Sequence, residues 1–132
     1  MSLQCKLIKQ TDYFTIEVDF VCPEEKTLAL IGPSGSGKTT IIRMLAGLHK
    51  PDRGRIECGG RTLFDSENGI HLSPQKREMG YVFQDYTLFP HLTIRENAGF
   101  AAKDVQEADY LLDYFRLKHL GDRKPHQVSG GE

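Results

Sequence analysis

Residues 32–40 read GPSGSGKTT, which matches the pattern G-x-x-x-x-G-K-[ST] and ends it with Lys38 and Thr39. A short apolar run, TLALI at 27–31, precedes the match, and apolar residues at helical spacing follow it. Glycines let the backbone curl so that successive amides point at one anion, and the start of a helix adds partial positive charge. The stretch therefore predicts a strand, a phosphate-binding loop and a helix, in that order. A flexible glycine-serine turn is the alternative, and the flanking patterns disfavour it.

The residue types in this loop suit a nucleotide and its metal ion. The Lys38 ammonium can reach the β- and γ-phosphates as a point charge. The Thr39 hydroxyl suits Mg²⁺, which prefers hard oxygen ligands. Kinases, GTPases and transport ATPases share such a loop, so the loop alone does not decide the class of protein. The candidate nucleotide-binding residues are Gly32, Pro33, Ser34, Gly35, Ser36, Gly37, Lys38, Thr39 and Thr40.

Composition limits the other possibilities. The chain has 132 residues, 39% of them hydrophobic, which is enough for the core of one domain at most. Its net charge is −1 with the two signs mixed, so we expect no nucleic-acid partner. No apolar run is long enough to span a membrane, and the N-terminus lacks an apolar signal-peptide core. Three scattered cysteines indicate free thiols in a reducing cytosol.

Periodicity predicts further elements in the first part of the chain. Alternating apolar residues predict a strand at 14–20. Apolar spacing after Lys38 predicts a helix, which Pro51 and Gly54 end. Residues 55–63 predict a small hairpin that turns at Gly59-Gly60. A polar stretch at 65–74 predicts a loop, and GYVF at 80–83 predicts another short strand.

The remainder of the chain is predicted to be mostly helical. Thr93 with Glu96 forms a capping-box pattern, and Asp104 with Glu107 repeats it. An apolar stripe then marks the second helix, which Gly121 is expected to end. Ser129 and Glu132 fit a third capping box. The stripe consists of Val105, Ala108, Leu112 and Phe115.

Two later stretches resemble one family. GYVFQDYTLFPHLTIRENAGF at 80–100 resembles the Q-loop region of ATP-binding cassette (ABC) proteins, and VSGGE at 128–132 resembles the start of their signature, usually written LSGGQ. The order P-loop, Q-loop, signature is also the family's order. The resemblance runs from about residue 3 to residue 132. It implies an α/β P-loop NTPase fold of the ABC type, with a mixed sheet, an antiparallel β subdomain and the start of a helical subdomain. Residues 1–83 would form the ATP-binding core, and residues 84–132 the Q-loop and helical subdomain.

The resemblance also implies roles for single residues, with ATP and Mg²⁺ as ligands. Ser34 to Thr40 would wrap the phosphates, with Thr39 on Mg²⁺ and Thr40 near the α-phosphate. Gln84 would complete the Mg²⁺ shell and sense the γ-phosphate, which makes Lys38 and Gln84 the candidate catalytic residues. An aromatic side chain would stack on adenine, with Tyr13 the first candidate and Phe14 the second. The signature residues that would close over ATP in a facing subunit are Ser129, Gly130 and Gly131.

Within the family, residues 60–100 most resemble ATPases of bacterial oxyanion importers, the molybdate type above all. Sulfate, iron, polyamine and sugar importers share stretches similar to LFPHLT. The implied partners are a second ATPase subunit across the signature and transmembrane permease subunits at the Q-loop. Phe89, Pro90, His91 and Leu92 could line the groove that receives the permease, or could pack inside the helical subdomain. The resemblance places the protein in the cytoplasm, on the inner face of the cell membrane.

The sequence shows no apolar strand that ends in Asp-Glu, the pattern that supplies the family's Walker B aspartate and catalytic glutamate. We therefore expect an incomplete ABC domain, truncated before the Walker B strand, which binds nucleotide with little turnover while the complete protein is an ATPase. A soluble ABC protein of DNA repair or translation is one alternative, which the short spacing from Gln84 to Ser129 disfavours. A non-ABC kinase or GTPase is another, but no Asn-Lys-x-Asp occurs.

Overall fold

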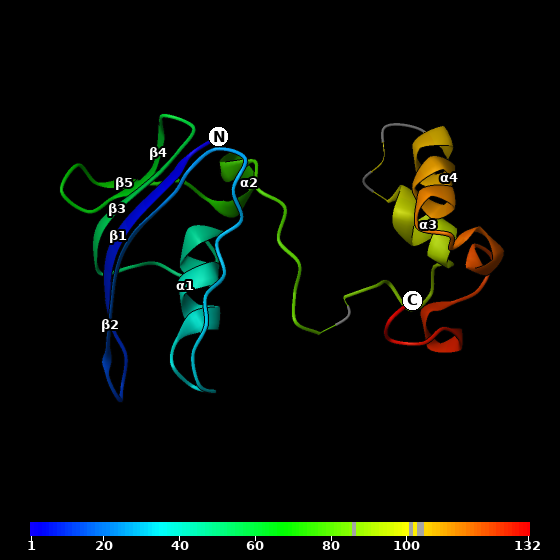
Figure 1. The fold of residues 1–132 in the computed structure, drawn as a ribbon, viewed down its shortest axis with the longest axis horizontal. Helices are drawn as coiled ribbons and strands as arrows, with labels where there is room; N and C mark the ends of the chain where they lie inside the picture. Colours follow the sequence, from blue (N-terminus) through cyan, green and yellow to red (C-terminus); the bar gives the residue numbers. More distant parts are fainter. Residues whose placement is uncertain (86, 101, 103–104) are drawn as a thin grey trace. The chain divides into compact units, whose positions relative to one another are not determined.

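The computed structural model describes residues 1–132 apart from residues 86, 101, 103 and 104 and the side chain of Val105. The chain forms two compact units, Met1–Tyr81 and Val82–Glu132. The position of one unit relative to the other is not determined (Figure 1). Within the described residues, no helix has the length and apolar character needed to cross a membrane.

The first unit is built on an antiparallel sheet (Figure 1). Its strand order is β2-β1-β3-β4-β5, and every pairing is antiparallel. β2 confirms the strand predicted at 14–20, and the neighbouring strand β1 forms a ladder with it along its whole length. The strands are β1 (Leu3–Gln10), β2 (Thr15–Cys22), β3 (Arg53–Cys58), β4 (Arg61–Asp65) and β5 (Ile70–His71).

Turns in this sheet use glycines with positive φ. Gly59 and Gly60 have φ of 57° and 76°, as a two-residue hairpin turn requires, and the predicted hairpin is confirmed. The expectation of a plain loop at 65–74 is wrong, because the chain reverses and adds β5 to the sheet. The Asp65 carboxylate accepts the amides of Glu67 and Asn68 at this reversal. A short helix, α2 (Pro74–Arg77), follows β5.

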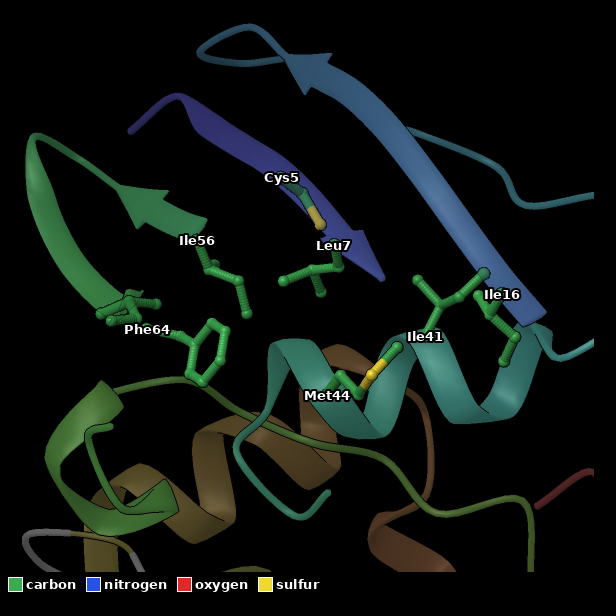
Figure 2. Close-up of a cluster of buried hydrophobic side chains, with 8 residues drawn as sticks. Cys5, Leu7, Ile16, Ile41, Met44, Ile56 and Phe64 are labelled. Carbon is green, nitrogen blue, oxygen red and sulfur yellow. The ribbon is translucent and has the colours of Figure 1, made fainter. Parts of the chain in front are cut away.

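The predicted helix is confirmed as α1 (Lys38–Leu45), which packs on one face of the sheet (Figure 2). Its buried face presents Ile41 and Met44, because residues three apart lie on the same side of a helix. Gly47 follows the helix with φ of 79° and ends it. The core that α1 covers consists of Cys5, Leu7, Ile16, Ile56, Leu63 and Phe64.

Two predicted strands are absent from the described structure. Residues 27–31 and 80–83 belong to no strand, and in them the side chains of Ile31 and Val82 are 93% and 95% exposed. A strand needs a neighbour to pair its N–H and C=O groups. The described sheet ends at β2 and β5, and neither segment adds to an edge. The apolar side chains of these segments favour burial, but several of them are exposed in this structure.

The second unit is helical. It contains α3 (Ile94–Gly99), α4 (Val105–Tyr114) and the 3₁₀ turns η1 (Lys118–Leu120) and η2 (Pro125–Gln127). The capping box of Thr93 and Glu96 is confirmed at the start of α3. The second capping box involves Asp104, which lies outside the described residues.

The predicted end of the second helix is wrong. The helix α4 stops at Tyr114, where Arg116 takes the left-handed conformation with φ of 59°. The amide of Leu117 then donates to the backbone oxygen of Leu112 at 2.7 Å, which closes the helix end. The expected stripe is only partly confirmed: Ala108 and Leu112 are buried, but Phe115 follows the helix and is 63% exposed.

Candidate functional site

The loop before α1 has the curled backbone expected of a phosphate cradle. Gly35 and Gly37 have φ of 79° and 91°, a conformation that residues with a side chain rarely adopt. The amide of Ser36 donates to the backbone oxygen of Pro33 at 3.3 Å and tightens the turn. Gly37 is also the N-cap of α1, so the loop and the helix are continuous.

β2 supports this loop through close packing at Gly37. A Cβ atom added at Gly37 would lie 2.7 Å from Cδ1 of Ile16 and 3.5 Å from Cε2 of Phe14. Ile16 is itself part of the core, as Figure 2 shows. Only glycine therefore allows the loop to approach the sheet this closely, and the core fixes the position of the loop.

The Lys38 side chain folds back over the loop. Its ammonium donates to the backbone oxygens of Gly32 and Pro33 at 2.8 and 2.6 Å. The hydroxyl of Ser36 lies 3.4 Å away. The positive charge is therefore held at the loop rather than in open solvent, on a flexible stem that can turn toward an anion.

Unpaired amides make the start of α1 suitable for an anion. Within the part of the chain that the structure describes, nothing accepts a hydrogen bond from the amides of Lys38, Thr39 and Thr40. The first turn also contains no acidic residue that would compete for this place. Free amides, the helix dipole and the Lys38 ammonium together suit a polyphosphate, and the exposed hydroxyl of Thr39 suits Mg²⁺.

The two aromatic candidates for adenine lie in different surroundings. Tyr13 is 92% exposed, in a turn whose amides are held by the Thr11 hydroxyl. The ring of Phe14 lies beside Gly37. The structure thus places the second candidate next to the loop and leaves Tyr13 in solvent, while the stacking role of either stays a prediction.

The remaining candidates belong to the second unit. Gln84 is exposed and precedes α3 in the chain. At the other end, the amide and hydroxyl of Ser129 both donate to Oε2 of Glu132 at 2.8 Å. The Glu132 amide donates to the backbone oxygen of Ser129 rather than to its hydroxyl, so only one half of the expected capping box is formed. The two bonds to Oε2, the backbone one first, lower the pKa of Glu132. Gly130 and Gly131 are exposed, and a Cβ at Gly131 would meet no atom within 4 Å.

Asn97 organises the turn at 89–92 and was not singled out from the sequence. Its Oδ1 accepts the amide of Phe89 at 2.8 Å, and its Nδ2 donates to the backbone oxygens of Phe89 and Thr93 at 3.1 and 2.9 Å. The Phe89 ring lies against that of Phe100, with centroids 4.4 Å apart. An asparagine one turn after a Thr N-cap was the pattern that could have indicated this contact.

A second hollow on the first unit lies away from the loop at 32–40. A shallow cleft of about 820 Å³ lies over β1, β2 and β3, lined by charged side chains of both signs, and includes none of residues 32–40. Among the described residues, no group of three or more His, Cys, Asp or Glu side chains could hold a metal ion.

The sequences of several curated proteins align with most of this chain. The molybdenum import ATP-binding protein ModC of Paramagnetospirillum magneticum is 48% identical, over 79% of this chain and 30% of the relative. ModC of Rhodospirillum rubrum is 43% identical, over 98% of this chain and 36% of the relative. The sulfate/thiosulfate import ATP-binding protein CysA of Synechocystis is 40% identical, over 94% and 36%. The chain spans about a third of the length of these relatives.

Solved structures and a family model agree with these relatives. The dimeric post-hydrolysis structure of the ATP-binding cassette MJ0796 bound to ADP and Pi has a TM-score of 0.74 and 25% identity, over 99% of this chain and 64% of that one. The fold predicted from the resemblance is thereby confirmed. The family model described as ABC transporter matches residues 16–132, which include the loop, Gln84 and the signature. The chain therefore belongs to the ABC transporter family.

Proposed function

We propose that this chain is the ATP-binding part of an ABC importer subunit, which in the complete protein couples ATP binding and hydrolysis to solute uptake. The observation that carries the proposal is the loop at 32–40, where left-handed glycines, unpaired amides and the Lys38 ammonium meet at the start of α1. Such a group of donors favours an anion with several oxygens, such as a polyphosphate. The relatives are named as import ATP-binding proteins, which supports the assignment to import.

The loop residues divide the work of holding ATP. The Lys38 ammonium would turn from the backbone oxygens of Gly32 and Pro33 to the β- and γ-phosphate oxygens. The amides of the first turn of α1 would receive the phosphates, with Thr40 near the α-phosphate. The hydroxyl of Thr39 and the amide oxygen of Gln84 would hold Mg²⁺, which neutralises charge on the phosphates when it is bound.

The exposed turn at 129–132 is proposed to act on a second ATPase subunit. The Ser129 hydroxyl and the amides of Gly130 and Gly131 would close over the γ-phosphate of ATP that the facing copy holds. Their exposure fits a surface that binds a partner. The solved relative is described as dimeric, which supports this arrangement.

Attachment to the membrane would come through permease subunits. The turn at 89–92, which hydrogen bonds with Asn97 stabilise, would contact the permease. Phe89 in this turn follows Gln84 by five positions in the sequence. A change in the position of Gln84 on ATP binding or hydrolysis would then be transmitted to the permease through the turn at 89–92. The protein would act in the cytoplasm, at the inner face of the cell membrane.

Among solutes, an oxyanion is the best-supported cargo. Molybdenum import proteins recur among the relatives, and a sulfate/thiosulfate import protein appears beside them. Molybdate is therefore the proposed solute of the complete transporter, with sulfate as the nearest alternative.

Turnover is proposed to need residues beyond those described. The sequence contains no apolar run that ends in Asp-Glu, the pattern that would supply a carboxylate to polarise an attacking water. We therefore expect the 132-residue chain to bind ATP with little release of phosphate.

The test is calorimetric titration of the 132-residue chain with Mg–ATP, beside Lys38→Ala and Thr39→Ala. Binding that Lys38→Ala abolishes, and that Thr39→Ala weakens only when Mg²⁺ is present, is the expected result. Arg43→Ala is the matched control, since Arg43 is an exposed cation on the same helix. Equal binding by the wild type and Lys38→Ala would refute the proposal, and rapid phosphate release would refute the claim of low turnover.

A further inference from the structure

Arg77, the last residue of α2, is buried beneath the end of the P-loop helix. Only 4% of its surface is exposed. Its Nη1 donates to the backbone oxygens of Met44 and Leu45 at 2.8 and 2.7 Å, and its Nε donates to that of Leu72 at 3.0 Å. The acceptors lie more than thirty residues before Arg77 in α1 and five residues before it in the chain. One guanidinium therefore joins α1 to the segment that follows β5.

The contact satisfies groups that a helix cannot satisfy by itself. The last backbone oxygens of a helix have no donor within the helix, and a cation there interacts favourably with the helix dipole. Within the described residues no carboxylate pairs with Arg77, and its Nη2 is buried without a hydrogen-bond partner. The backbone oxygens of α1 are thus the main compensation for burying this charge.

Gly47 makes room for the guanidinium. Its φ is 79°, and a Cβ atom at this position would lie 2.5 Å from Nε of Arg77. The glycine that ends α1 and the arginine that binds its last turn therefore form a single arrangement. A change at either position is expected to disturb the other.

Arg77 binds the end of α1 that lies away from the phosphate loop. α1 has eight residues and begins at Lys38, so Arg77 binds the helix roughly 11 Å from the phosphate loop. Arg77 also precedes, by seven positions in sequence, the Gln84 that the proposed function places at Mg²⁺. We propose that Arg77 is a positioning residue for nucleotide binding, which holds α1 so that the Lys38 ammonium and the first-turn amides face the phosphates together. This inference rests on the proposed function.

A positioning role differs measurably from a role in stability alone. A variant that merely unfolds part of the sample lowers the number of sites per chain but leaves the Kd of the folded fraction unchanged. A variant in which α1 shifts keeps the number of sites and raises the Kd. Calorimetry reports both quantities in one titration.

The experiment titrates Mg–ATP into the wild type, Arg77→Ala, Arg77→Lys, Gly47→Ala, the double variant Gly47→Ala/Arg77→Ala, and Arg43→Ala as control. We expect Arg77→Ala to raise the Kd about tenfold, a typical coupling between separated parts of a protein, with the number of sites unchanged. Arg77→Lys should recover part of the affinity, because lysine keeps the charge but lacks the planar fork. Gly47→Ala should also raise the Kd, and the double variant should fall short of the sum of the two single effects.

Hydrogen exchange without nucleotide gives the second measurement, in which α1 amides should exchange faster in Arg77→Ala than in Arg43→Ala. An unchanged Kd in Arg77→Ala and Gly47→Ala, or a loss of sites alone, would overturn the inference while wild-type binding upholds the proposed function. If the wild type fails to bind Mg–ATP, the proposed function is wrong. Independently of binding, equal exchange of the α1 amides in Arg77→Ala and Arg43→Ala would show that Arg77 does not hold α1 in place.

Discussion

Different interactions stabilise the interior of each of the two units. In the first unit, Leu7, Met44 and Ile56 are wholly buried between the sheet and α1, and the phosphate loop rests on this core. Among the described residues of the second unit, the buried hydrophobic side chains are small in number, and several large aromatic side chains are exposed. The loop at 32–40 is therefore held in place by apolar packing, whereas the second unit keeps its shape largely through polar contacts.

Those polar contacts gather at the start of α3. The amides of Ile94 and Arg95 donate to the backbone oxygens of Arg123 and Gly121 at 2.8 and 2.9 Å. The Arg95 guanidinium also pairs with the carboxylate of Asp109. Each hydrogen bond contributes only about 1 kcal/mol net, so the second unit is expected to open before the first.

The largest effect is expected in the core of the first unit. Ile56→Ala should lower the free energy of unfolding by about 2–5 kcal/mol, because it leaves a cavity where the side chain has no exposed surface. Phe115→Ala, in the exposed region of the second unit, should change it by less than about 0.5 kcal/mol. Urea unfolding measures both. Similar losses in the two variants would mean that Phe115 is buried in solution and would remove the contrast.

A smaller effect is expected at Asn97, which tests the polar support of the second unit. Asn97→Ala should cost about 1–2 kcal/mol, since it removes the bonds that hold the turn at 89–92. Asn97→Asp keeps the acceptor for the Phe89 amide and loses the donors, so its cost should be intermediate. Hydrogen exchange of the Phe89 amide gives a local measurement. Protection of that amide in Asn97→Ala equal to the wild type would contradict the assignment.

The smallest effect concerns pH at the turn of the signature. The Ser129 amide and hydroxyl lower the pKa of Glu132 below its ordinary value of 4.5. A lowered folded-state pKa means that the contact contributes fully above the ordinary value and is lost as the pH falls through the folded-state value. NMR titration of the Glu132 carboxyl should give a midpoint below 4.5. Ser129→Ala should raise that midpoint only partly, because the backbone bond remains, and an ordinary midpoint in the wild type would show that the turn is open.

Local patterns predicted some elements of each unit. β2, the Gly59-Gly60 turn, α1 and the Thr93 cap follow from spacing and from single residues with special conformations. The strand predicted at 27–31 is absent. Periodicity indicates which side chains prefer burial but not whether a neighbouring strand is available for pairing. The end of α4 was missed because Arg116, rather than a glycine, takes the left-handed position.

In the candidate site too, most features that depend on neighbouring residues were predicted, and features that depend on distant residues were not. The loop residues follow from the motif, since glycine conformation and lysine chemistry act within a few positions. Asn97 binds residues four to eight positions before it, so a local pattern could have indicated its contacts. Arg77 instead depends on a partner thirty-three residues away, which the sequence does not place near it. An arginine in a polar stretch reads as exposed, and only the fold reveals that it binds the end of α1.

We propose that the loop at 32–40, held on a packed core, receives the phosphates of ATP. Amide chemical shifts in the NMR spectrum of the 132-residue chain, recorded as Mg–ATP is added, test it most directly. We expect the largest changes at the amides of residues 35–40. Lys38→Ala should abolish these changes, and the amides of β1 and β3 should not shift. Changes spread through β1 and β3, or absent from residues 35–40, would contradict it.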